Sequence, residues 1–112
     1  MKIAFTSTGT TWDSLIDSRF GRTGYFLIYD DETQLISIVD NQNVKNEAHG
    51  AGTATAQKIY EAKPDVLITG NGPGENAAIA LKQMNIKIFV DAHEMTVKQA
   101  YEQFKNNKLK AL

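Results

Sequence analysis

Cysteine is absent from this sequence of 112 residues. A disulfide scaffold, a thiol nucleophile, a thiolate zinc site and a cysteine-held iron–sulfur cluster are therefore excluded within the chain. The absence of cysteine is also consistent with a reducing compartment. The first residues contain too short an apolar run for a signal peptide, and no segment approaches the length that spans a bilayer. We therefore expect a cytoplasmic protein with no membrane partner.

The sequence also lacks an excess of charge of either sign. Its formal net charge is −1, and acidic and basic residues are interspersed. Because a nucleic-acid-binding protein usually carries a basic stripe, we expect no nucleic-acid partner. The only arginines are Arg19 and Arg22, both in the segment DSRFGR. A guanidinium fork binds carboxylate or phosphate, so both are candidate ligand contacts; the alternative is that one pairs with Asp13 or Asp17.

Apolar runs rich in β-branched and aromatic residues predict five strands in a single domain that spans residues 1–112. These strands lie at Lys2–Ser7, Tyr25–Asp30, Leu35–Asp40, 65–70 and 85–90. The segment DET, between the second and third strands, is typical of a hairpin turn. The fourth strand, DVLITG, is continuously apolar, which indicates a strand covered on both faces.

Helical spacing predicts three helices. The first spans 51–62 and is ended by Pro64, and the second carries an apolar repeat from Ala77 to Met84. The third follows Thr96, because TVKQ has the pattern of a capping box in which threonine and glutamine satisfy each other's backbone N–H groups. Trp12 and Phe20 are expected to pack into the protein and anchor the long loop between the first two strands.

The order of these elements predicts an α/β fold. Three consecutive strands indicate an antiparallel meander, and the later strand–helix–strand units indicate parallel pairs with right-handed crossovers. We therefore predict a ribonuclease-H-like mixed five-stranded sheet of order 3-2-1-4-5, flanked by three helices. The carboxyl ends of strands 1 and 4 then face one crevice, where open α/β sheets bind ligands.

Three loops converge on that crevice: residues 7–22, from STGTT to DSRFGR, the segment EAHGAG, and TGNGPGEN at residues 69–76. Glycine allows close approach of a ligand to the backbone, and a helix N-terminus offers unpaired N–H groups to an anion. The candidate ligand contacts in these loops are Thr8, Arg19, Arg22, His49, Gly50, Gly52, Asn71, Gly72 and Gly74.

Each glycine-rich loop also has a simpler interpretation. TGNGPGEN matches neither the P-loop nor the dinucleotide fingerprint, so a plain turn remains an alternative to a ligand loop. Asn76 is expected to be the N-cap of the helix that follows, with Glu75 complementing the helix dipole. His49 is a candidate metal ligand because imidazole suits iron, although a local hydrogen bond is the alternative. His93 has no neighbouring ligand in the sequence and is not a candidate.

Catalytic groups are hard to assemble from this sequence. The first strand has no aspartate, so the paired carboxylates of two-metal nuclease chemistry are missing. Asp65 begins its strand and is therefore expected to point away from the crevice. No Ser–His–Asp spacing is present either. We therefore expect no enzymatic activity.

Several segments together resemble the dinitrogenase iron–molybdenum cofactor biosynthesis family. They are KIAFTS, FGRTGYFLIYD, HGAGTATAQ, DVLITGNGPGENAAIALKQMNIKIF and TVKQAYEQFKNNKL, which cover nearly the whole chain. The family contains small cofactor carriers of nitrogenase assembly and has the ribonuclease-H-like fold. The resemblance implies non-catalytic binding of the FeMo-cofactor or an iron–sulfur precursor cluster, with cluster donor or acceptor proteins as partners. Whether the chain forms a homo-oligomer stays open.

The sequence departs from that family at one position. Nitrogenase-associated members often have a histidine directly before the Phe-Gly pair, where this chain has Arg19. His49 is then expected to be the remaining histidine near the crevice. The resemblance implies that an anionic cluster is held by His49, backbone amides and the two arginines, largely through charge. The alternative function is a sensor for a small phosphate-containing metabolite or nucleotide that uses the same glycine loops.

Overall fold

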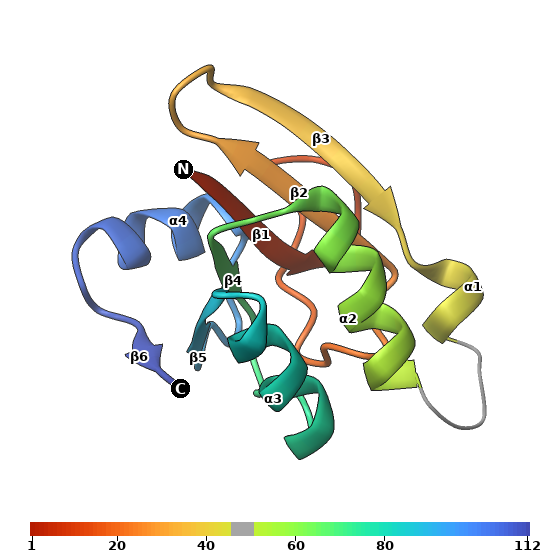
Figure 1. The fold of residues 1–112 in the computed structure, drawn as a ribbon. Coiled ribbons are helices and arrows are strands. Elements are labelled where there is room, and N and C mark those ends of the chain that lie inside the picture. The colour runs from red at the N-terminus through yellow and green to blue at the C-terminus, as the bar shows by residue number, and fades with distance from the viewer. Residues whose placement is uncertain (46–50) are drawn as a thin grey trace.

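The computed structural model describes residues 1–45 and 51–112, and their side chains except at 44, 45 and 51–53. Figure 1 shows the arrangement of the elements. They are β1 (Lys2–Ser7), β2 (Tyr25–Asp30), β3 (Leu35–Asp40), α1 (Gln42–Lys45), α2 (Ala51–Ala62), β4 (Val66–Ile68), α3 (Glu75–Gln83), β5 (Lys87–Val90), α4 (Val97–Lys105) and β6 (Lys110–Ala111).

The strands form one sheet of order β3-β2-β1-β4-β5-β6. β1, β2 and β3 pair antiparallel, whereas β1, β4 and β5 pair parallel. The predicted order of the first five strands is confirmed, as are the meander and the parallel units. Two elements were not predicted: β6, which pairs antiparallel with β5, and the short helix α1 in a segment that has no periodic pattern.

Each face of the sheet is covered by helices and has its own core cluster. α2 and α3 lie side by side over one face, and α4 covers the other (Figure 1). Successive residues of β1 alternate between the faces: Ile3 and Phe5 join the cluster under α4, and Ala4 joins the cluster under α2 and α3. All three residues of β4 are buried, which confirms the strand covered on both faces.

The two aromatic anchors predicted for the loop between β1 and β2 are confirmed. Trp12 packs in the cluster under α4, with its ring centroid 5.0 Å from that of Tyr29 and 5.6 Å from that of Tyr101. Phe20 is 2% exposed and packs against Phe26 on the other face of the sheet. This loop is therefore held on both faces of the sheet.

The starts of α4 and α3 differ in how well the sequence predicts them. Thr96 and Gln99 form both hydrogen bonds of the capping box, as predicted. The expected N-cap Asn76 is wrong, because α3 begins at Glu75 and its N-cap is Gly74. The Gly74 carbonyl oxygen accepts the first helical hydrogen bond, from the Ala78 N–H at 2.8 Å. Asn76 therefore lies inside the first turn, whereas Glu75 does complement the helix N-terminus.

Candidate functional site

Two of the three predicted loops meet at the carboxyl ends of β1 and β4. The Asn71 N–H donates a hydrogen bond to the Ser18 carbonyl oxygen at 2.7 Å. A Cβ atom on Gly70 would lie 2.7 Å from the Cα atom of Ser18, a separation that real side chains essentially never show. Glycine at position 70 thus allows the DSRFGR loop to lie directly against the TGNGPGEN loop.

A network of buried hydrogen bonds links the start of the DSRFGR loop to the ends of β1 and β4. The Asp17 N–H donates to the Thr6 carbonyl oxygen at 3.0 Å, and the Thr6 hydroxyl donates to the Asp17 carbonyl oxygen at 2.7 Å. The Thr6 hydroxyl is also hydrogen-bonded to the Thr69 hydroxyl at 3.0 Å. All three residues are buried, so these directional bonds fix the DSRFGR loop relative to both strands.

The amino-terminal end of α2 is tied to the same loop. The Asn41 amide donates to the Thr23 carbonyl oxygen at 3.0 Å and to the Thr55 hydroxyl at 3.2 Å. The Thr55 hydroxyl in turn donates to the Gly21 carbonyl oxygen at 3.4 Å. Gly52 lies in the first turn of α2, one turn before Thr55. His49 and Gly50, predicted as ligand contacts, lie outside the described residues.

The two arginines lie in this loop with different exposure. The Arg19 side chain is 64% exposed, and its Nε atom lies 3.6 Å from Oδ1 of Asp17. The sequence left open whether one arginine pairs with a nearby aspartate instead of contacting a ligand. The structure shows such a pair between Arg19 and Asp17. The pair leaves most of the Arg19 side chain in solvent, where an anion can reach it. Arg22, further along the loop, is partly buried.

The remaining predicted contacts differ in what surrounds them. The Thr8 hydroxyl donates to the Leu15 carbonyl oxygen at 3.1 Å, so it is already engaged within its own loop. Asn71 is exposed beside its contact with Ser18. Among the described residues, nothing lies within 4 Å of a Cβ placed on Gly74. The surroundings of Gly74 are therefore open to a ligand, whereas a Cβ on Gly72 would lie 3.6 Å from side-chain atoms of both Leu112 and Val90.

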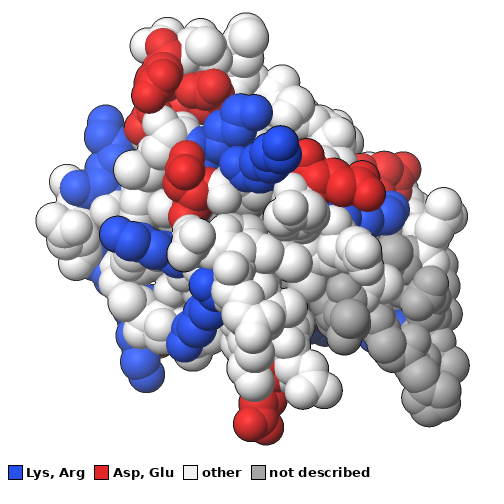
Figure 2. Space-filling model, viewed as in Figure 1, with Lys and Arg blue, Asp and Glu red and all other residues white. Residues whose placement is uncertain are grey.

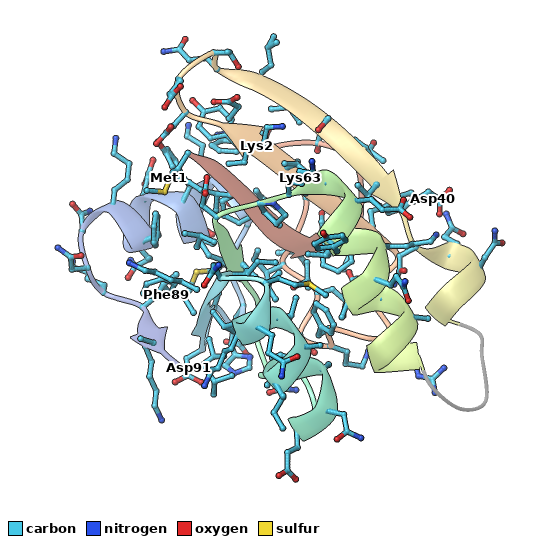
Figure 3. All side chains as sticks on the ribbon, in the orientation of Figure 1. Met1, Lys2, Asp40, Lys63, Phe89 and Asp91 are labelled. Carbon is cyan, nitrogen blue, oxygen red and sulfur yellow. The ribbon has the colours of Figure 1, made fainter. Side chains whose placement is uncertain are left out.

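His93 also lies at the junction, which the sequence pattern did not predict. Its Nδ1 atom is 3.1 Å from the position of a Cβ on Gly70. The expectation that His49 is the only remaining histidine near the crevice is therefore wrong, whereas the position of His49 lies outside the described residues. The missed signal was the strand order, because β5 runs parallel to β4 and the residues after β5 emerge at the same edge. Figure 3 shows Asp91 at this edge, with Lys2 and Lys63 at the opposite one.

The surface charges are mixed. Figure 2 shows acidic and basic side chains interspersed over one face of the molecule, in keeping with the formal net charge of −1. In the described part of the chain, no group of three or more His, Cys, Asp or Glu side chains is placed to hold a metal ion. None of its helices is both long and apolar enough to cross a membrane.

The clearest pKa shifts lie away from this junction. A hydrogen bond to the Asp31 carboxylate raises the pKa of the Met1 amino group. A backbone hydrogen bond from Glu32 lowers the pKa of the exposed Asp30 carboxyl. Both groups lie beside the hairpin between β2 and β3, and their hydrogen bonds stabilise that turn.

Comparisons with known proteins give a consistent result. The family described as dinitrogenase iron-molybdenum cofactor matches residues 1–107. The structure is similar to the apo form of the orange protein from Desulfovibrio gigas, with 35% sequence identity and a TM-score of 0.93, over 99% of this chain and 92% of that one. It is also similar to a putative NifB protein from Thermotoga, with 32% identity and a TM-score of 0.84, over 99% and 92% of the two chains. A comparison with curated proteins found no match.

Proposed function

Because the chain belongs to the dinitrogenase iron-molybdenum cofactor family, we propose that it is a non-catalytic carrier of an iron–sulfur-type metallocluster. The cargo is the iron–molybdenum cofactor or a precursor of it. The observation that carries this proposal is the junction of the DSRFGR and TGNGPGEN loops through Asn71 and Ser18. It brings open backbone, an exposed arginine and an imidazole to one edge of the sheet.

The donor set at this junction suits a preassembled anionic cluster better than a single metal ion. The described residues offer no group of three metal-ligating side chains, and the chain has no cysteine. A bound cluster must therefore keep its own inorganic ligands. Arg19 and backbone N–H groups supply positive potential to such an anion. The similar orange protein is described in an apo form, the term for a protein without its bound group.

A site that has few protein ligands also suits a carrier, because a cluster held mainly by charge can be transferred without breaking several metal–ligand bonds. We propose cytoplasmic cluster donor or acceptor proteins as the partners. Nucleic acid and membranes are not proposed as partners, because the charges are balanced and interspersed along the sequence.

Anaerobic loading tests this function. The protein is mixed with isolated iron–molybdenum cofactor and, separately, with a thiolate-ligated [4Fe–4S] cluster. We expect metal and visible absorption to co-elute with the protein in gel filtration. Replacing both Arg19 and Arg22 with alanine should weaken retention about tenfold or more, since charge-assisted contacts are lost.

The matched control removes two positive charges at the opposite edge of the sheet. Lys2 and Lys87 are exposed at the amino ends of β1 and β5, so their double alanine variant should retain the cluster as the parent does. Equal loss in both double variants would show that net charge, and not this site, holds the cluster. A parent that retains neither cluster but gains thermal stability with nucleotides or sugar phosphates would favour the phosphate sensor.

A further inference from the structure

β3 forms an open edge of the sheet. It is the last strand in the order β3-β2-β1-β4-β5-β6, and no described element lies outside it (Figure 1). Its six residues pair with β2 in one continuous antiparallel register without a bulge. The strand contains no lysine and no proline, the residues that commonly protect an exposed edge. The opposite edge differs, because β6 has only two residues and one of them is Lys110.

The open edge is also apolar. Leu35, Ile36 and Ile38 are 69%, 46% and 38% exposed, and they are three of the eight large hydrophobic side chains that are exposed in the described part of the chain. Ile38 is paired with Leu27 of the cluster under α4, so Ile36 and Ile38 share that face, whereas Leu35 lies on the face of α2. Neighbouring exposed apolar side chains of this kind mark an interaction surface.

The hydrogen bonds to β2 identify which backbone groups of β3 face outward. The Asn41 N–H donates to the Gly24 carbonyl oxygen at 2.9 Å, in the same register as the β2–β3 pairing. Because hydrogen-bonded residues alternate along an antiparallel pair, the odd-numbered residues of β3 bond to β2, and the backbone groups of Ile36 and Ile38 point outward. A further strand must therefore bond to these two residues.

We propose that β3 pairs antiparallel with β3 of a second copy of this chain, about a two-fold axis at Ser37. In this register Ile36 of each copy lies opposite the partner's Ile38, so the outward backbone groups and the exposed isoleucines meet at the same positions. On the other face, Leu35 lies opposite the partner's Val39. The contact is isologous, as a two-fold axis requires.

The distribution of charge favours a second copy in this register. β3 is uncharged from Leu35 to Val39, and acidic residues follow at Asp40 and precede it in the turn DDE at 30–32. Pairing about Ser37 places Asp40 opposite the partner's uncharged Gln34, whereas parallel pairing in register would place it opposite the partner's Asp40. Like charges directly opposite each other destabilise a pair of strands.

The pairing leaves both proposed cluster sites open. β3 runs in the same direction as β1, because each is antiparallel to β2, so both strands end at the edge that carries the site. The two-fold axis reverses the partner's strands and places the two sites at opposite ends of the extended sheet. The dimer does not rest on the carrier function, and its tests use protein without a cluster.

Sedimentation velocity between about 10 µM and about 1 mM protein tests the association. One strand per copy is less than a standard interface, so we expect a weak dimer with a Kd of about 100 µM. Ile36→Lys should weaken association about tenfold or more, because a charge replaces an apolar contact. Ile79→Lys, at an isoleucine of α3 that is 50% exposed, is the matched control and should associate as the parent does. A parent that stays monomeric, or equal loss in both variants, would overturn the proposal.

A pair of opposite charges tests the register. Ile36→Lys and Ile38→Glu should each associate poorly alone, whereas a mixture of the two should dimerise, because the introduced lysine then faces the introduced glutamate. No recovery in the mixture would contradict the axis at Ser37. Stronger association of Ile36→Lys alone would also contradict it, since residue 36 then faces the partner's Asp40.

The absence of cysteine allows a direct covalent test. Ser37→Cys places two thiols opposite each other at the axis, with Cβ atoms about 4.5–5.5 Å apart. Under mild oxidation this variant should form a covalent dimer about tenfold faster than Asp40→Cys, whose two copies lie at opposite ends of the contact. Circular dichroism establishes that each variant is folded. Equal rates of cross-linking, or association that continues beyond the dimer, would overturn the proposal.

Discussion

The two halves of the loop between β1 and β2 are held by different combinations of packing and hydrogen bonding. Residues 8–16 are anchored by the packing of Trp12 in the cluster under α4 and by backbone hydrogen bonds to the start of α4. Residues 17–24 are anchored by the packing of Phe20 on the other face of the sheet and by buried side-chain hydrogen bonds of Thr6, Thr23 and Asn41. Packing of apolar surface is nondirectional, whereas hydrogen bonds fix distances and angles. Because the buried side-chain hydrogen bonds are concentrated in the second half, we expect that half to hold the proposed site in a fixed shape and Trp12 of the first half to contribute chiefly to stability.

The neighbours of each half support this division. The first half pairs with the start of α4: the Trp12 carbonyl oxygen accepts from the Lys98 N–H at 3.0 Å, and Ser14 and Ile16 bond to the same region. The second half instead contacts the loop after β4 through Ser18 and α2 through Gly21. Substitutions in the two halves should therefore have separable effects on stability and on cluster retention.

Trp12→Ala should have the largest effect on stability. Removing an aromatic ring that contacts Phe5, Tyr29 and Tyr101 should lower the free energy of unfolding by about 3 kcal/mol, measured by urea denaturation. Trp12→Phe should cost less. Cluster retention by the folded protein at low temperature should stay within a factor of about three of the parent. A tenfold loss of retention without loss of stability would contradict the division.

Thr6→Val should affect both properties. The buried Asp17 carbonyl oxygen and the Thr69 hydroxyl each lose a partner, which should cost about 2 kcal/mol of unfolding free energy. Because these bonds position the second half, cluster retention should also fall. Thr10→Val changes an exposed threonine in the first half and is the matched control. Unchanged retention in a destabilised Thr6→Val protein would mean that the network does not shape the site.

Gly70→Ala should separate the two loops of the site. The new Cβ would lie 2.7 Å from the Ser18 backbone and 3.1 Å from the His93 ring, so the loops must move apart at a cost of about 1–2 kcal/mol. Gly74→Ala has open space around it and should change stability by less than about 0.5 kcal/mol, because weaker capping is offset by the lower entropy of the unfolded chain. Similar losses in both would show that glycine itself, and not the close approach, matters.

The sequence was sufficient for most of the fold. The sequence of each strand from β1 to β5 carries a clear hydrophobic pattern, such as the continuously apolar β4. The order of the elements then restricts the topology, because connections between strands follow simple rules. β6 was not predictable, because the two residues Lys110 and Ala111 carry no pattern and depend on pairing with β5. The start of α3 was misplaced because side-chain capping preferences favour asparagine, whereas the observed cap is glycine.

The meeting of the DSRFGR and TGNGPGEN loops was predictable from the sequence, but the details of their contact were not. Strand order placed the DSRFGR and TGNGPGEN loops together, and the contact between Ser18 and Asn71 confirms this. The role of Gly70 and the place of His93 come from hydrogen bonds between loops that are more than 20 residues apart along the chain, which local patterns do not encode. The ligand roles of Arg19, Arg22 and the glycines remain predictions.

The smallest expected effect is a pH dependence that arises at Tyr101 of α4, whose ring packs against Trp12 of the first half. Burial, followed by the nearby Tyr29, raises the pKa of Tyr101 above its ordinary value of 10.0. The folded protein then keeps a proton that the unfolded chain loses above about pH 10. The resulting stability is fully present below pH 10 and is lost as the pH rises through the folded-state pKa.

Tyr101→Phe should therefore show a shallower fall of the urea midpoint between pH 9 and 11 than the parent, since the lysines titrate in both proteins. Tyr60→Phe, at a tyrosine that is 54% exposed, is the control and should follow the parent. If Tyr101→Phe also follows the parent, the phenol is hydrated despite its place beside Trp12, and the first half of the loop is held less tightly than its packing indicates.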